Sequence, residues 1–377
     1  MNSIKINYKL IFRICALIIG IFFACYFTNI VIYIFLAYIM MLIGKPLAKS
    51  INRIKIFKKN VPMGFCSILV IIIFILVLLL ALLFFVPALV NEVKLFKDFD
   101  YDSLVEYFST LFNNIQIFLY NNNLIDSVDS LVEIIIEKAN KVLNFKSIST
   151  VIGNVVSSTG SFFLGLFAVF FIAFFFIKDD IKIENLFKFF FSEKYSGRVT
   201  QVMNKINNLL SRYFVGLLIK TFIMIIILYA AFAIFGIKGA LLMAFIGGIT
   251  NIIPYFGPFI GGAIICLFGT INCISIELYT GILPMIIKVC AILIGANVID
   301  NWFLGPYIYS QSIKVHPVEV FIVTILGGSI GGIAGMVLGI PVYTILRVTV
   351  MEIYNSIFKK SDDIINPGNL LPDSDAS

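Results

Sequence analysis

Residues Gly239 to Asn272 read GALLMAFIGGITNIIPYFGPFIGGAIICLFGTIN and contain no charged side chain. A helix needs ~20 apolar residues to cross the hydrocarbon core of a bilayer, and this stretch is longer than that. The sequence Pro-Tyr-Phe-Gly-Pro, from Pro254 to Pro258, lies in its middle and predicts a break in the helix. Broken backbone at membrane depth is tolerated where protein buries it or where it lines a cavity. The stretch therefore indicates a membrane protein with a permeation pathway.

The composition of the whole chain supports this interpretation. Of its 377 residues, 60% are hydrophobic and 13% are charged, and the mean hydropathy is +1.03. Soluble domains have about 45–50% apolar and about 25% charged residues. We therefore expect an all-α polytopic membrane protein with about eight membrane segments. The net charge of +7 suits orientation in the membrane and contact with anionic lipid, and we expect no nucleic-acid partner.

The alternation of apolar and polar stretches divides the chain into five parts. We expect a three-span N-terminal scaffold (1–87), an extracytoplasmic amphipathic helical segment (88–150), a fourth span with a cytoplasmic loop (151–212), a C-terminal transport core (213–350) and a cytoplasmic, disordered tail (351–377).

Some boundaries of the spans are also expected from the sequence. Residues 10–27 and 30–43 form two short spans, and basic residues between Lys45 and Lys59 indicate the cytoplasmic side. Pro62 opens the third span and Pro87 ends it. The fifth span begins at about Tyr213.

Three apolar blocks fill the last third of the chain, at 239–272, 281–304 and 316–347. The first and third are both broken by glycine and resemble a weak internal repeat. If every block crosses the membrane once, the chain has eight spans. If the first and third are re-entrant hairpins, neither adds a net crossing, and the segment 305–315 changes side. Both alternatives stay open at this point, and both place the two termini inside.

Several motifs in this region belong together. They are Tyr213-Phe214-Val215-Gly216, Asn251 to Pro258, Asp300-Asn301, Pro306, His316-Pro317, Gly331 to Met336 and Pro341. In this order they resemble the autoinducer-2 exporter family (AI-2E) of bacterial membrane proteins, over roughly 205–350. The sequence departs from the family pattern at Leu217 and Asn297, where the family usually has glutamine.

The resemblance implies a membrane transporter and not an enzyme. Its expected cargo is the small furanone-type quorum signal, exported from the cell in quorum sensing. The alternative within the family is a sodium(lithium)/proton antiporter. The resemblance also implies a multi-pass protein of the bacterial inner (plasma) membrane and a homo-oligomer, since pentamers are described for the family. A channel or a non-transporting membrane scaffold would also be compatible with the sequence.

The broken stretch itself supplies the first group of candidate pathway residues. Two prolines remove backbone donors and so free carbonyls, and we expect Gly257 to adopt the positive φ of a turn. The freed carbonyls, the amide of Asn251 and the hydroxyl of Tyr255 then suit a polar solute or a cation. The alternative is a packing break between helices. The group comprises Asn251, Pro254, Tyr255, Gly257 and Pro258.

The second group lies further along the chain. Asp300 and Asn301 end the second block, where Asp300 suits a cation or a proton or else caps a helix end. Gly327, Gly328 and Gly331 indicate either close helix packing or a second broken element.

Other titratable residues have simpler interpretations. We expect Lys220 to extend toward the cytoplasmic interface and His316, the single histidine, to begin a helix. Neither a catalytic motif nor a multi-histidine metal site is present in the sequence, so we expect no cofactor and no metal.

Overall fold

The computed structural model describes residues 26–56, 59–97, 159–179, 196–274, 282–305 and 316–354, with the single residues 22, 110 and 117. Most of the expected first span, most of the extracytoplasmic segment 88–150 and most of the tail 351–377 lie outside the described residues. So do the residues before Ser196 in the expected cytoplasmic loop, and residues 306–315.

Helices account for nearly all of the described chain, which confirms the predicted all-α class. They are α2 (Thr28–Asn52), α3 (Met63–Lys97), α7 (Thr159–Lys178), α9 (Ser196–Ile234), α10 (Ala240–Thr250), α11 (Phe256–Ile274), α12 (Ile282–Ile299), the π-helical turn η3 (Asp300–Leu304) and α14 (Pro317–Tyr354). A short antiparallel pair, β1 (Lys55–Ile56) with β2 (Lys59–Asn60), connects α2 to α3.

The described helices have the length and the surface of membrane spans. Five of them are long and apolar enough to cross a membrane, and α7, α10 and α11 contain shorter apolar helices. Large apolar side chains such as Leu83, Phe167 and Phe222 are more than half exposed. Apolar surface of this extent faces lipid in a membrane protein. The predicted polytopic membrane protein is therefore confirmed.

Three helices extend beyond the predicted spans. α2 continues through Lys45 and Lys49 to Asn52, because Gly44 and Ala48 are buried on its other face. α3 contains Pro87 and runs on to Lys97, so the prediction that Pro87 ends the span is wrong. Lipid offers no water to an unpaired backbone N–H or C=O group. The backbone groups on both sides of Pro87 therefore keep their hydrogen bonds within the helix.

α9 also starts earlier than expected, at Ser196 instead of near Tyr213. Its polar first turns bury Ile206 and Leu210 against the other helices. At 39 residues the helix is about 58 Å long, which exceeds the ~30 Å hydrocarbon core. The expected boundary at residue 212 therefore falls inside a continuous helix.

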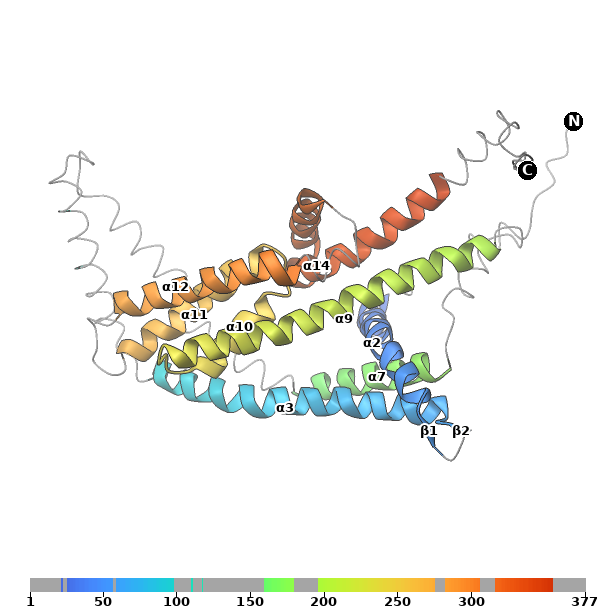
Figure 1. Cartoon of the computed structure of the whole chain (residues 1–377), viewed down its shortest axis with the longest axis horizontal. Coiled ribbons are helices and arrows are strands. Elements are labelled where there is room, and N and C mark those ends of the chain that lie inside the picture. The colour runs from blue at the N-terminus through green and yellow to red at the C-terminus, as the bar shows by residue number, and fades with distance from the viewer. Residues whose placement is uncertain are drawn as a thin grey trace, which may run out of the picture.

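The described residues pack into two main hydrophobic clusters that share α9. One unites α2, α3, α7, the N-terminal half of α9 and the C-terminal part of α14, with Val70, Ile177 and Tyr213 among its members. The other unites α10, α11, α12 and the C-terminal half of α9, with Phe232 and Ile265 among its members. Figure 1 shows this division, with α10 to α12 gathered beside the C-terminal half of α9 and α2 and α7 beneath its other half.

The first broken block folds as a helical hairpin. α10 ends at Thr250, residues 251–255 turn the chain, and α11 leads back along α10. A Cβ added to Gly257 would overlap the carbonyl oxygen of Thr250, so the two arms touch at the turn. The positive φ of the turn, 63°, belongs to Tyr255 and not to Gly257. That prediction was wrong, because Gly257 is needed for close backbone approach.

The third block is a second helical hairpin. Gly331 and Gly332 interrupt α14 with non-helical angles, and Gly332 has a φ of 57°. A Cβ added to Gly327 would overlap the carbonyl oxygen of Gly335, and the reverse is also true. Further from the turn, Gly339 lies against the Val323 backbone. The two arms of α14 are therefore antiparallel.

The open end of this second hairpin carries its polar contacts. The hydroxyl of Tyr343 donates to Oε2 of Glu319, and Nη1 of Arg347 lies 3.6 Å from the same oxygen. The backbone N–H of Val318 donates to Nδ1 of His316 at 3.3 Å, so His316 begins the helix as predicted.

Both broken blocks are helical hairpins, which is the shape that the re-entrant alternative requires. α10 has 11 residues, which is about 16 Å of helix and about half of the hydrocarbon core. An arm of that length brings its turn to mid-membrane depth when the hairpin enters from one side.

Candidate functional site

A hollow of about 1120 Å³ lies between the turn of the first hairpin, the end of α12 and the start of α14. Ligand pockets in proteins usually measure about 300–1,000 Å³. Six of the residues predicted from the sequence line it, namely Asn251, Pro254, Tyr255, Pro258, Asp300 and Asn301. The turn of the first block and the end of the second block thus meet at one cavity.

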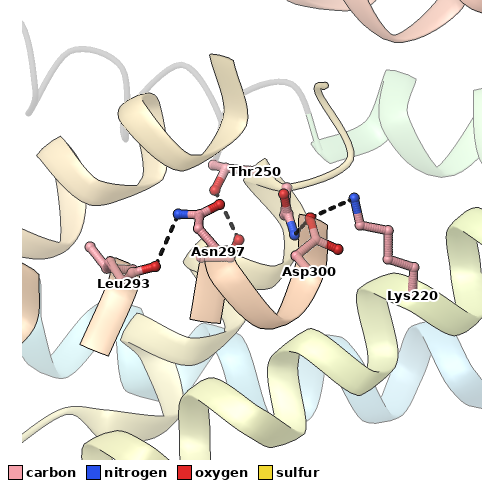
Figure 2. Close-up of polar contacts among 7 residues, drawn as sticks. Lys220, Thr250, Leu293, Asn297 and Asp300 are labelled. Carbon is pink, nitrogen blue, oxygen red and sulfur yellow. Dashed lines mark hydrogen bonds and ion pairs between the residues drawn. The ribbon is translucent and has the colours of Figure 1, made fainter. Parts of the chain in front are cut away.

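A buried ion pair forms part of the wall of this hollow. Nζ of Lys220, on α9, lies 2.9 Å from Oδ2 of Asp300, and both side chains are 6% exposed. Figure 2 shows the lysine extending from its helix toward the carboxylate. An ion pair removed from water is stable only when its geometry and remaining hydrogen bonds are good.

The carboxylate of Asp300 has a second partner in the turn of the first hairpin. Nδ2 of Asn251 donates to Oδ2 of Asp300 at 3.2 Å. Oδ1 of Asp300 is buried and has no hydrogen-bond partner among the described residues. One oxygen therefore accepts two donors, while the other keeps its capacity to accept.

The local backbone places Asp300 at a change of helix type. α12 ends at Ile299 and the chain continues as the π-helical turn η3, whose first residue is Asp300. π-Helical segments are rare and are frequent at functional sites. The turn holds the carboxylate buried, beside the Asn251 amide.

Aromatic contacts connect the first hairpin to the start of α14 at the edge of the hollow. The rings of Phe256 and Phe321 stack at a centroid distance of 5.8 Å. The hydroxyl of Tyr255 donates to the carbonyl of Pro317 at 3.3 Å. Tyr255 makes this contact from a left-handed conformation, which is strained for a non-glycine residue and typical of functional sites.

The structure corrects the interpretation of one charged residue and shows the surroundings of another. Lys220 was expected to reach the cytoplasmic interface, but it is 5% exposed and pairs with Asp300. Asp300 was left open between an ion-binding residue and a helix cap; the N-cap position of η3 belongs to Ile299, and the carboxylate of Asp300 contacts Lys220 and Asn251. The missed signal was that a lysine and an aspartate within membrane segments usually pair with one another.

The four glycines predicted as pathway residues have structural positions outside the lining of the hollow. Gly257 closes the first hairpin, and Gly327 closes the second through its contact with Gly335. A Cβ on Gly328 would meet the side chain of Met336, and Gly331 lies at the turn. Both interpretations of the α14 glycines therefore apply. The glycines allow close packing of the two arms, and the helix between these arms is broken.

The fold and the cavity define a multi-pass helical membrane protein with two helical hairpins and a buried ion pair. A family model described as "AI-2E family transporter" matches residues 10–355. The chain belongs to this family of membrane transporters.

Individual relatives are named as transport proteins. The chain is 23% identical to "Putative transport protein YrrI" of Bacillus subtilis (strain 168), covering 86% of each chain. It is 28% identical to "Putative transport protein YueF" of the same organism, over 56% of this chain and 54% of that one. It is 21% identical to "Putative transport protein MJ1177" of Methanocaldococcus jannaschii, over 67% of this chain and 71% of that one.

Proposed function

We propose that the protein is a secondary transporter that exports a small polar solute, autoinducer-2-like, through the hollow beside Lys220 and Asp300. The observation that carries this proposal is the buried ion pair in the wall of a cavity that the first hairpin borders. Its family membership supports transport as the general activity. Transporters commonly place solute at mid-membrane depth beside interrupted helices.

The lining of the hollow supports a solute of moderate polarity. Its polar groups gather around Asn251, Asn297 and the ion pair, and the remaining wall includes Phe259 and Trp302. A cavity with few convergent polar groups and apolar walls is the usual form of a small-molecule site. The polar groups would orient the solute, and the apolar wall would accept its carbon skeleton.

The direct test is solute flux in vesicles reconstituted with the full-length protein. The probe is radiolabelled autoinducer-2, and we expect flux to fall at least about tenfold in Asp300→Asn, because the neutral amide no longer pairs with Lys220. Asp179→Asn is the matched control, since Asp179 is an exposed acid paired with Lys178 at the surface. Equal flux in Asp300→Asn and the unaltered protein would exclude the hollow as the solute site.

A second candidate function is sodium(lithium)/proton antiport, which Oδ1 of Asp300 favours, because it has no hydrogen-bond partner in the part of the chain that the structure describes. A carboxylate oxygen with spare acceptor capacity is a group that a cation can occupy. Addition of sodium or lithium to vesicles with an internal pH dye should then change the internal pH, and the change should vanish in Asp300→Asn. A pH response that persists in this variant would exclude Asp300 from antiport.

A non-transporting scaffold makes the opposite prediction. Its partner would bind the extracytoplasmic segment, so deletion of 95–145 would abolish function and Pro254→Ala would be harmless. For the transporter, Pro254→Ala alters the turn that borders the hollow and lowers flux.

A further inference from the structure

Two cysteines lie in the wall of the hollow, on neighbouring helices. Cys266 belongs to α11 and Cys290 to α12, and both line the same cavity as Asn251 and Asp300. Cys290 is exposed and Cys266 is half-buried, and both are free thiols. Cys66, by contrast, is buried in the other hydrophobic cluster. The transport proposal gives the two thiols of the hollow no role.

The antiparallel packing of α11 against α12 brings these two thiols together (Figure 1). A Cβ added to Gly262 would lie 3.3 Å from Cδ1 of Leu293. One added to Gly269, about two turns further along α11, would overlap Cε of Met285. In this register the two cysteines lie opposite one another, between the two glycine contacts. The glycines let the helices approach closely, and the thiols are within hydrogen-bonding reach of each other.

Thiols this close can be joined by a two-electron oxidation with hydrogen peroxide. The accessible sulfur of Cys290 attacks one peroxide oxygen, so that an S–O bond forms, the O–O bond breaks and one water leaves. The sulfur of Cys266 then attacks the sulfenic acid, so that an S–S bond forms, the S–O bond breaks and a second water leaves. The two sulfurs lose two electrons in total, and the peroxide is reduced to two waters.

A bond at this place would tie together the two elements that carry the site. α11 leads back to the turn that contains Asn251, and α12 leads on to Asp300 in η3. A disulfide holds its two Cα atoms about 4.4–6.8 Å apart, so α11 could no longer slide along α12. Transporters with broken helices work by moving one group of helices against another. The bond would therefore stop such a motion at the wall of the hollow.

We propose that Cys266 and Cys290 form a peroxide-sensitive modification site, and that their reversible disulfide arrests transport. The effect on transport rests on the proposed function of the hollow, whereas formation of the bond does not depend on it. Disulfides in reducing compartments are usually transient and redox-sensing, and a thiol reductant returns this one to the free pair.

Peptide mapping of the purified full-length protein tests whether the bond forms. The protein is treated with hydrogen peroxide, free thiols are blocked with N-ethylmaleimide, and the digest is analysed by mass spectrometry without reductant. We expect a linked peptide that joins Cys266 to Cys290 and that disappears after dithiothreitol. Oxidation of Cys290 to a sulfinic or sulfonic acid, without the linked peptide, would overturn the proposal.

The matched control for the mapping is Cys66→Ser. Sγ of Cys66 donates to the carbonyl of Val61 at 3.7 Å, and a serine hydroxyl can keep this hydrogen bond. The variant should form the linked peptide as the unaltered protein does. Loss of the link in this variant would mean that Cys66, and not the pair in the hollow, is the oxidised site.

Solute flux in reconstituted vesicles tests what the bond does. Each protein is measured before peroxide, after peroxide and after dithiothreitol, so that it serves as its own reference. We expect the flux of the unaltered protein to fall at least about fivefold and then to return, because the bond blocks relative motion of the helices. Cys66→Ser should behave alike, and the fall should be small in Cys266→Ser, where Cys290 lacks its partner. An equal fall in Cys266→Ser would assign the effect to oxidation of Cys290 alone and would contradict the disulfide.

The outcomes also separate this proposal from the proposed function. If Asp300→Asn abolishes flux but peroxide leaves the flux of the linked protein unchanged, the hollow remains the transport site and the disulfide does not control it. If flux is insensitive to Asp300→Asn, the hollow is not the transport site, and the linked peptide alone decides whether the two cysteines are a modification site.

Discussion

Lys220 and Asp300 lie on different helices, 80 positions apart in the sequence, and their charged atoms are 2.9 Å apart in the protein interior. Asn251 joins them from the turn of the first hairpin. Three separate parts of the C-terminal region thus converge on one carboxylate. Replacement of a buried ion pair by apolar residues often costs no stability, so the pair itself points to a functional requirement.

This relationship predicts the stability of variants of the pair. Asp300→Leu leaves the buried ammonium of Lys220 without its carboxylate. We expect the free energy of unfolding to fall by about 3–5 kcal/mol. The double variant Lys220→Met with Asp300→Leu carries no buried charge, so most of the stability should return. Thermal unfolding in detergent measures both. If the double variant were as unstable as Asp300→Leu, the unpaired charge of Lys220 would not be the cause of the lost stability.

The same double variant should remain inactive. Apolar side chains can fill the space of the pair but provide no partner for a polar solute. Flux in vesicles, measured beside the unfolding midpoint, therefore separates folding from transport. Restored flux would contradict a role of the pair in transport.

The second hairpin depends on the contact between Gly327 and Gly335. Gly335→Ala places a methyl group against the carbonyl of Gly327. The two arms must then move apart, and we expect the free energy of unfolding to fall by about 1–3 kcal/mol. Gly331→Ala is the matched control, because open space surrounds that position. Unfolding midpoints of the two variants provide the comparison. Equal unfolding midpoints of the two variants would mean that the arms of the hairpin can move apart without loss of stability.

Cys290 offers a chemical probe of the hollow. It is exposed and lines the cavity, whereas Cys66 is buried. In variants that keep only one of these two cysteines, N-ethylmaleimide should alkylate Cys290 at least about tenfold faster and should reduce solute flux. Intact-protein mass spectrometry measures the alkylation. Full alkylation of Cys290 with unchanged flux would place the solute path elsewhere.

The hairpins also predict the side of the membrane on which residue 310 lies. If each hairpin returns to the side from which it enters, segment 305–315 lies with the basic residues around Lys49, on the cytoplasmic side. In a cysteine-free background, Ser310→Cys should react with an impermeant thiol reagent only in inverted vesicles. Lys49→Cys is the control for that side. Labelling of Ser310→Cys from outside would restore the single-crossing topology.

The class of protein and much of the site follow from local patterns in the sequence. Apolar length identifies membrane segments, and prolines within an apolar run mark an interruption of the helix. For this reason the sequence alone predicts Asn251, Pro254, Tyr255 and Pro258 at a cavity. Asp300 could be predicted as a site residue for a similar reason. A charged side chain inside a membrane span is energetically costly and usually has a function.

The partner of Asp300 could not be found by local reasoning. Lys220 is only eight residues from Arg212, so the sequence suggests that its side chain extends to the cytoplasmic membrane interface. Only the packing of α9 against α10 and α12 brings Lys220 to Asp300. The aromatic wall was hidden for another reason. In an apolar chain, Phe259 and Trp302 cannot be told from lipid-facing residues by type alone.

The turn of the first hairpin shows a third limit. Glycine is the usual residue at positive φ, which made Gly257 the natural choice. The structure assigns that conformation to Tyr255, because its hydroxyl contacts Pro317 and its ring packs edge-on against Phe321. Tertiary contacts of this kind override a local preference and leave no trace in the pattern of residue types.

Helix α9 contributes Tyr213 and Leu217 to one hydrophobic cluster and Met224 and Leu228 to the other. Lys220 stands between these two groups, within about two turns of helix. If the halves of the molecule shift against each other, the bend or slide must be absorbed in that short interval. The ammonium–carboxylate separation would then change with the shift, which makes this one distance a direct gauge of the relative position of the two clusters.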